Sequence, residues 1–317
     1  PTVLTARQLE RLLKAVREHF PRWSGDVEFT VEANPGTVDE EKLRALRGGG
    51  VNRLSFGAQS FDDGLLAAIG RIHSAEDVVR SVELARASGF SNLSIDLMFG
   101  LPHQTAAQLE RSLDRALSLD LPHYSVYALK VEEHTLFHAL YERGELPLPD
   151  EEEEWEMFRL VMERLRGAGY VQYEISNFAK SGFESRHNTV YWRNESYYGL
   201  GAGAHGYVRG VRHVNVKGVQ AYIDASRSGL PVLERHEVTE PEAMEDFMML
   251  GLRMLRGVTR ADFRSQFGQQ PEDVFGRTLE RLLKRGLIEE TAGGWRLSEA
   301  GVPLGNEVIG AFLGAGG

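Results

Sequence analysis

Four polar side chains lie at, or just after, the predicted ends of strands, which is where a parallel barrel carries its chemistry. They are Glu32, Gln59, Arg71 and Asp96. Asp96 interrupts a strand with the apolar residues Leu93, Ile95, Leu97 and Met98, and an acid inside a buried strand is unfavourable unless another group hydrogen-bonds to it. A pair of ribose hydroxyls is one such group. The alternative for Asp96, and for each of the others taken singly, is a structural role such as capping the next loop or helix.

The elements that position these residues alternate between strand and helix over residues 1–180. This alternation predicts a parallel α/β sheet or barrel. Short strands are expected at residues 27–31, 52–56, 92–99, 123–129 and 171–175. A complete (β/α)8 barrel needs roughly 250 residues, so about five βα units indicate a partial barrel. The acidic run of residues 151–154 follows Asp150 and predicts the solvated first turn of a helix, not a metal site.

Beyond residue 238 the pattern changes to helices, expected at residues 242–255, 260–267 and 272–285. Two short strands follow at 287–290 and 295–297, so this part resembles a winged helix. Acidic side chains outnumber basic ones here, which favours a packing or partner role over DNA binding. We therefore expect three segments: a partial barrel at 1–180, a β-rich segment at 181–238 and a mostly helical domain at 239–317.

The composition narrows the classes of function. The 317 residues carry a net charge of −10, which argues against a nucleic-acid partner, since phosphate binding needs a basic surface. No stretch approaches the roughly 18 apolar residues that a membrane-spanning helix needs. The chain contains no cysteine and hence no disulfide that would indicate secretion, so we expect a cytoplasmic protein.

Three segments resemble the radical S-adenosylmethionine (SAM) proteins of the oxygen-independent coproporphyrinogen III oxidase family. They are Val-Glu-Ala-Asn-Pro at residues 31–35, Arg-Leu-Ser-Phe-Gly-Ala-Gln-Ser-Phe at 53–61 and Ile-Asp-Leu-Met-Phe-Gly-Leu-Pro-His-Gln-Thr at 95–105. The spacing between them also resembles that of the family. The resemblance implies a parallel barrel of the radical SAM type.

The resemblance also implies a role for each of the four polar residues in a SAM pocket. Arg71 would hold the methionine carboxylate, which a guanidinium can bind with two parallel hydrogen bonds. Gln59 and Asp96 would bind the ribose hydroxyls. Glu32 would lie at the polar end of the cofactor.

The absence of cysteine bears directly on this resemblance. The family reduces SAM with a [4Fe–4S] cluster that three cysteine thiolates hold, and no other side chain suits that role. Residues 1–4 resemble the end of the family's Gly-Gly-Gly-Thr-Pro motif, which follows the cysteine-rich loop. We therefore expect the cluster ligands upstream of Pro1, in a first βα unit that this sequence lacks. Loss of the cluster is the alternative.

The segment Arg-His-Asn-Thr-Val-Tyr-Trp at residues 186–192 resembles the His-Asn-x-x-Tyr-Trp pattern of one subgroup of the family, the heme chaperones. Segments at 198–205 and 244–253 resemble the same subgroup, so the likeness extends over essentially the whole chain. It implies His187 as an axial ligand of heme iron, with His205 as a weaker candidate. Ser185 stands where the family often has cysteine. The alternative for His187 is a structural histidine in a loop that two aromatic residues anchor.

Three functions follow as hypotheses. The first is a heme chaperone on a radical SAM scaffold that delivers heme to respiratory acceptor proteins. The second is an oxygen-independent coproporphyrinogen III oxidase, which decarboxylates its substrate through a SAM-derived radical; a chain without cysteine cannot perform that step by itself. The third is a binding protein that uses the same scaffold without a cluster.

Overall fold

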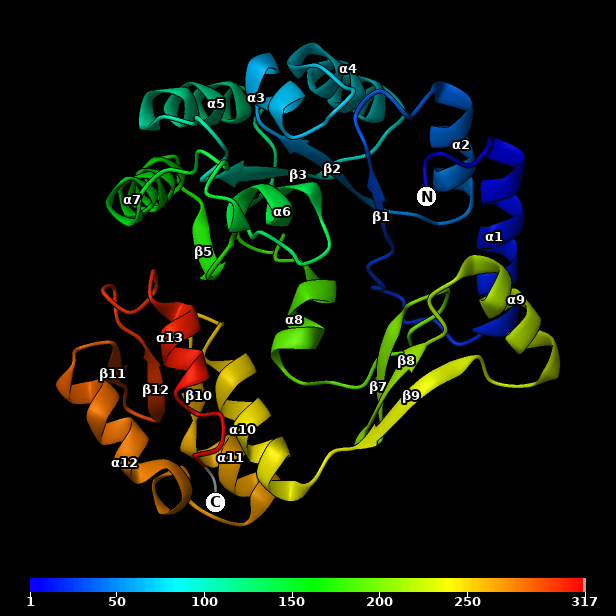
Figure 1. Ribbon diagram of the computed structural model, residues 1–317. Coiled ribbons are helices and arrows are strands. Elements are labelled where there is room, and N and C mark those ends of the chain that lie inside the picture. The colour runs from blue at the N-terminus through cyan, green and yellow to red at the C-terminus, as the bar shows by residue number, and fades with distance from the viewer. Residues whose placement is uncertain (316–317) are drawn as a thin grey trace. The chain divides into compact units, whose positions relative to one another are not determined.

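The computed structural model describes residues 1–315 and divides the chain into two compact units, with the boundary between Glu184 and Ser185. The first unit is built on a six-stranded sheet in the order β1-β2-β3-β4-β6-β5 (Figure 1). Its first four strands pair in parallel: β1 (Thr30–Ala33), β2 (Arg53–Gln59), β3 (Asn92–Phe99) and β4 (His123–Ala128). The predicted parallel sheet is thus confirmed.

The other edge of this sheet differs from the expected succession of βα units. The predicted strand at 171–175 exists as β5 (Val171–Glu174), but it pairs with β6 (Asn177–Ala179), and both pairings of β6 are antiparallel. Because β6 is antiparallel to both of its neighbours, β5 keeps the direction of the parallel strands, and the departure from the expectation is the antiparallel β6 between β4 and β5. The chain turns back after Glu174 within two residues, and no helix can fit into so short a connection.

Seven helices of the first unit precede or connect its strands, and in Figure 1 α2 to α5 and α7 lie along the outer side of the parallel strands. They are α1 (Ala6–His19), α2 (Glu40–Gly48), α3 (Asp63–Ala68), α4 (Ala75–Ala87), α5 (Ala106–Ser118), α6 (Leu136–Glu142) and α7 (Glu151–Gly167). The predicted acidic first turn of α7 is confirmed, with Asp150 in a capping box with Glu153.

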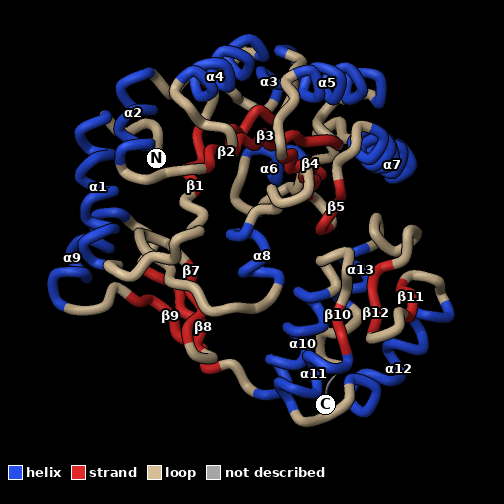
Figure 2. The backbone as a smooth tube through the Cα atoms, turned by 180° about the vertical axis from the view of Figure 1, so that it is seen from behind, coloured by secondary structure: helices blue, strands red, loops and turns tan. Residues whose placement is uncertain are grey.

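The second unit begins with α8 (Arg186–Trp192) and a three-stranded antiparallel sheet of β7 (His205–Val208), β8 (Val211–Asn215) and β9 (Val232–Glu237), with α9 (Val219–Ser228) between the last two (Figure 2). The segment around His187, which lies in the part expected to be β-rich, is helical. The Ser185 hydroxyl caps this helix by accepting a hydrogen bond from the Asn188 amide at 3.3 Å.

The rest of the second unit has the predicted helices followed by a hairpin. The helices are α10 (Glu240–Gly251), α11 (Arg260–Phe267), α12 (Pro271–Lys284) and the short α13 (Gly305–Gly310). The hairpin strands β11 (Ile288–Glu290) and β12 (Gly294–Leu297) form a sheet with β10 (Val258–Thr259). Phe263, Phe275 and Phe312 form the buried centre. Among the described residues, no helix is both long and apolar enough to cross a membrane.

Candidate functional site

The parallel sheet presents a polar face on the side opposite its apolar one. Ser55 pairs with Glu32 across the first two strands, and Asp96 pairs with Ser125 across the next two. Side chains alternate between the faces along a strand, so the neighbours Leu54, Phe56, Ile95, Leu97 and Val126 point the other way, and all are buried. The face that carries Glu32 and Asp96 can therefore bind a polar ligand, while the opposite face holds the core together.

Asp96 is partly buried on this face and is held by two serines. The Ser55 hydroxyl donates a hydrogen bond to its Oδ1 at 3.1 Å, and Ser125 also hydrogen-bonds to the carboxylate. Burial raises the pKa of Asp96 to about 6, an effect that the two serines oppose and the nearby charge of Glu32 reinforces. An acid this perturbed on an open polar face is typical of a ligand-binding position.

This shift predicts a gain in stability when Asp96 is neutralised. Because the pKa of Asp96 in the folded state exceeds the usual aspartate value of 3.8, the folded state binds the proton more tightly, and this stabilisation is lost as pH rises through about 6. Asp96→Asn should therefore raise the free energy of unfolding at pH 8 by about 1–2 kcal/mol, and the gain should shrink below pH 6. Urea unfolding across this range measures it.

The matched control for that prediction is Asp120→Asn. Asp120 is exposed, and its hydrogen bond with Lys180 lowers its pKa. The charged form of Asp120 is therefore favoured in the folded state, whereas that of Asp96 is disfavoured. This substitution should give no gain in stability at pH 8. An Asp96→Asn variant that is less stable than wild type at pH 8 would contradict the account of this carboxylate.

Gln59 lies at the end of β2 and is 4% exposed. The register between β2 and β3 shifts between Phe56 and Gln59, and Gln59 has a φ of 64°, which is unusual for a residue other than glycine. Its side-chain Oε1 accepts a hydrogen bond from the Tyr127 hydroxyl at 3.1 Å. A Cβ atom at Gly57 would lie 3.0 Å from Gln59 Nε2, so a glycine at position 57 leaves room for the side-chain amide of Gln59.

Arg71 follows α3 in a short loop that two contacts hold. Its Nη1 donates to Asn34 Oδ1 at 3.1 Å, and the ring of His73, two residues on, lies 3.1 Å from the Ala58 carbonyl through Nε2. Asn34 comes from the turn after β1, and Ala58 comes from β2. The loop thus brings the Arg71 guanidinium to the strand ends that also carry Gln59.

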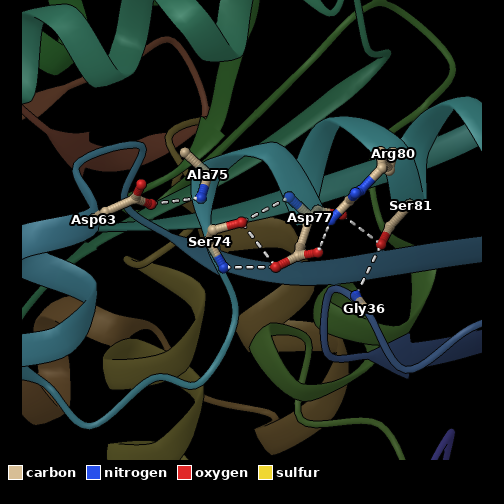
Figure 3. A network of polar contacts seen from close by, with 7 residues as sticks. All are labelled: Gly36, Asp63, Ser74, Ala75, Asp77, Arg80 and Ser81. Carbon is tan, nitrogen blue, oxygen red and sulfur yellow. Dashed lines mark hydrogen bonds and ion pairs between the residues drawn. The ribbon is translucent and has the colours of Figure 1, made fainter.

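Figure 3 shows the network that fixes the same two loops at the start of α4. Ser74 and Asp77 form a capping box, and their hydrogen bonds, with help from Arg80, lower the pKa of Asp77 to about 2. The Ser81 hydroxyl donates to the Asp77 carbonyl at 2.7 Å and accepts from the Gly36 amide at 3.0 Å. One helix therefore anchors both the turn after β1 and the loop of Arg71.

All four predicted residues thus lie at one end of the parallel sheet. Tyr127 lies among them, because the charges of Asp96, Arg71 and Glu32 all act on its phenol, and Gln59 hydrogen-bonds to it. The sequence reasoning missed Tyr127, Asn34, Ser55 and Ser125. Alternating polar residues within β2 and β4 were the available signal.

The chemistry of these donors fits SAM, which carries a carboxylate, an ammonium group and a ribose diol. Arg71 is a cation for the carboxylate, while Asp96 and Gln59 offer an acceptor and an amide for the diol. The residues do not fit an iron–sulfur cluster, since the chain has no cysteine. Within residues 1–315, no group of three or more His, Asp or Glu side chains is arranged to hold a metal ion.

His187 lies in the first turn of α8, in the second unit, with its side chain exposed. Its ring meets Tyr191 edge to face at a centroid distance of 4.8 Å, and Tyr191 meets Tyr197 in the same way at 4.6 Å. The Arg253 guanidinium lies 4.3 Å from the centre of the Trp192 ring. The motif thus presents a histidine beside a row of aromatic rings.

His205 starts β7 and borders, together with Tyr197, a cavity of about 470 Å³ against the three-stranded sheet. The preceding glycine-rich loop is fixed by Asn215, whose Nδ2 donates to the carbonyls of Gly199 and Gly201 at 3.0 Å each. Close packing is one reason for glycine here, because a Cβ at Gly199 would lie 2.1 Å from the His205 carbonyl oxygen.

Comparison with known proteins finds two family models, the radical SAM superfamily over residues 1–116 and the HemN C-terminal domain over residues 238–304. Among curated proteins, the heme chaperone HemW of Bacillus subtilis is 49% identical over 315 residues, which cover 99% of this chain and 83% of that protein. HemW of Escherichia coli is 34% identical, with 99% of this chain and 82% of that protein covered.

Among solved structures, the coproporphyrinogen III oxidase HemN of E. coli, a radical SAM enzyme, superposes with a TM-score of 0.83. The match covers 98% of this chain and 75% of that one at 22% sequence identity. At this identity the likeness shows the fold alone, and the radical SAM fold expected from the sequence is confirmed.

Proposed function

Because the chain belongs to the HemW family of radical SAM proteins, we propose that it is a heme chaperone, which binds heme and delivers it to respiratory acceptor proteins. The observation that carries this proposal is the 49% identity to a heme chaperone along nearly the whole chain. His187 supports it from the structure, since an exposed imidazole beside aromatic rings is suited to bind the iron of a flat porphyrin.

The test of heme binding is a titration of the purified chain with hemin, followed by absorbance in the Soret region. We expect the band to shift and to saturate at one heme per chain. If the Soret band remained identical to that of free hemin at every protein concentration, the proposal would be contradicted.

We further propose that Glu32, Gln59, Arg71 and Asp96 hold SAM at the end of the parallel sheet. In radical SAM proteins the bound cofactor supplies a 5′-deoxyadenosyl group. Arg71 would orient its carboxylate end, and Gln59 and Asp96 would hold the ribose. Because this chain has no thiolate, we derive no reaction that passes through a cluster.

Coproporphyrinogen III oxidase is the second candidate function, and the likeness to HemN favours it at the level of the fold. The identity of 22% to HemN, against 49% to HemW, places it behind the chaperone. A binding protein without a cluster remains the third. Oxidase activity would be detected as decarboxylation of coproporphyrinogen III under anaerobic, reducing conditions, and we expect none from this chain.

A further inference from the structure

Tyr127 is a half-buried tyrosine at the centre of the proposed SAM site with no assigned role. It lies in β4 opposite Met98 of β3, on the same face as Asp96 and Ser125. Burial and the negative charge of Asp96 raise the pKa of its phenol, so it keeps its proton at neutral pH. Its proton is therefore available for donation, and the hydroxyl donates it to Gln59 Oε1 at 3.1 Å.

This hydrogen bond decides which end of the Gln59 amide is free. A glutamine amide has an oxygen that accepts and a nitrogen that donates, and rotation exchanges the two. Because the oxygen is engaged by Tyr127, the Nε2 donor lies on the side of Gly57. An Arg71 nitrogen lies on the same side, 3.9 Å from the position that a Cβ atom at Gly57 would take. The site then offers one amide donor at Gln59 and one carboxylate acceptor at Asp96.

That pairing of one donor with one acceptor matches a vicinal diol. One ribose hydroxyl can donate to the Asp96 carboxylate, while the other accepts from the Gln59 amide. If the amide rotated, both protein groups would present oxygen acceptors, and the second hydroxyl would lose its donor.

We infer that Tyr127 is a positioning residue of the adenosyl site: its hydroxyl locks the Gln59 amide with the nitrogen toward the ligand and thereby determines selectivity for the ribose diol. This inference rests on the SAM part of the proposed function. It deepens that proposal by naming the residue that makes the site specific for a ribonucleoside, although that residue acts through Gln59.

The probes are S-adenosylhomocysteine and its 2′,3′-dideoxy analogue, with dissociation constants measured by calorimetry on the full chain. Tyr127→Phe should raise the dissociation constant of S-adenosylhomocysteine about tenfold, the effect of losing one well-placed hydrogen bond. It should leave that of the dideoxy analogue unchanged. In a Gln59→Ala background, Tyr127→Phe should have no further effect on either ligand, because the group that it positions is gone.

Tyr124→Phe is the matched control in the same strand. The Tyr124 hydroxyl donates to the Ala116 carbonyl at 2.9 Å, away from the site, so this variant loses a buried hydrogen bond without touching the ligand face. It should bind both probes as wild type does, and circular dichroism should show all variants folded.

Each outcome of this experiment is decisive. The inference is overturned if Tyr127→Phe weakens both ligands equally, if it weakens neither, or if its effect persists without Gln59. Failure of the wild-type chain to bind S-adenosylhomocysteine would overturn the SAM proposal and this inference with it. Hemin titration of the same samples reports on the chaperone proposal separately, and Tyr127→Phe should match wild type there.

Discussion

Replacing His187 by alanine should weaken hemin binding about 100-fold, since it removes the nitrogen that is proposed to bind the iron. His187 is exposed in the first turn of α8, so its loss should leave the fold and its stability essentially unchanged. The dissociation constant comes from the Soret titration of the variant beside wild type. The spectrum of the loaded variant should also lose the features of a histidine-bound iron, and added imidazole should restore them.

His19→Ala is the control for this substitution. His19 is likewise exposed near the end of a helix, where its ring lies 2.8 Å from the Ala15 carbonyl through Nδ1. It lies in the first unit and has no proposed part in heme binding, so its variant should bind hemin as wild type does. Equal hemin affinity in His187→Ala and wild type would show that another group holds the iron. His205 is then the next residue to replace.

Arg71→Ala is expected to weaken binding of S-adenosylhomocysteine by about 30-fold, because a hydrogen-bonded ion pair with a carboxylate contributes about 1.5–3 kcal/mol. Asn34 and the contact of His73 with Ala58 already hold the Arg71 loop before the ligand binds, so binding costs little conformational entropy. The ligand 5′-methylthioadenosine lacks the carboxylate. It should bind the variant and wild type equally.

Arg159→Ala serves as the control, since Arg159 is an exposed arginine on α7 that pairs with Glu163 and takes no part in the network that holds the Arg71 loop. It should bind both ligands with wild-type affinity. If Arg71→Ala weakened 5′-methylthioadenosine as much as S-adenosylhomocysteine, Arg71 would act on the adenosyl group or on the fold. The assignment of the carboxylate to Arg71 would then be wrong.

The strands that carry the proposed SAM site could be predicted because local signals define them. Alternating apolar residues and terminal turns located β2, β3 and β4 within a few residues. Whether a strand pairs in parallel depends on its partner and on the connection between them, which local patterns do not encode. Hence β5 was predicted, but the antiparallel strand β6 that separates it from β4 was not.

The predicted site residues were those with strong chemistry in unusual places, such as an acid in an apolar strand. Tyr127 escaped notice because tyrosine is ordinary in a strand, and its importance comes from a register that brings it to Gln59 from another strand. Ser55 and Ser125 escaped for the same reason. A helix at His187 was also missed, since its start depends on the Ser185 cap and its seven residues are too few for a periodic pattern.

The proposed site also explains a feature that stability alone does not. An Asp96 carboxylate with a pKa near 6 destabilises the folded state at neutral pH, and an asparagine would accept the same Ser55 hydrogen bond. Residues that lower stability without a packing reason are typical of binding sites. A diol that donates to this carboxylate would bind more tightly as pH rises through about 6, when the acceptor becomes charged.

The most direct test of the central claim is transfer of heme from the loaded chain to an apo-form of a respiratory b-type cytochrome, followed by the absorbance of the acceptor. Apomyoglobin, which captures heme without a specific partner, measures passive release. The chaperone account predicts transfer to the cytochrome at a rate that rises with its concentration and exceeds the rate to apomyoglobin. Equal rates that do not depend on acceptor concentration would contradict it.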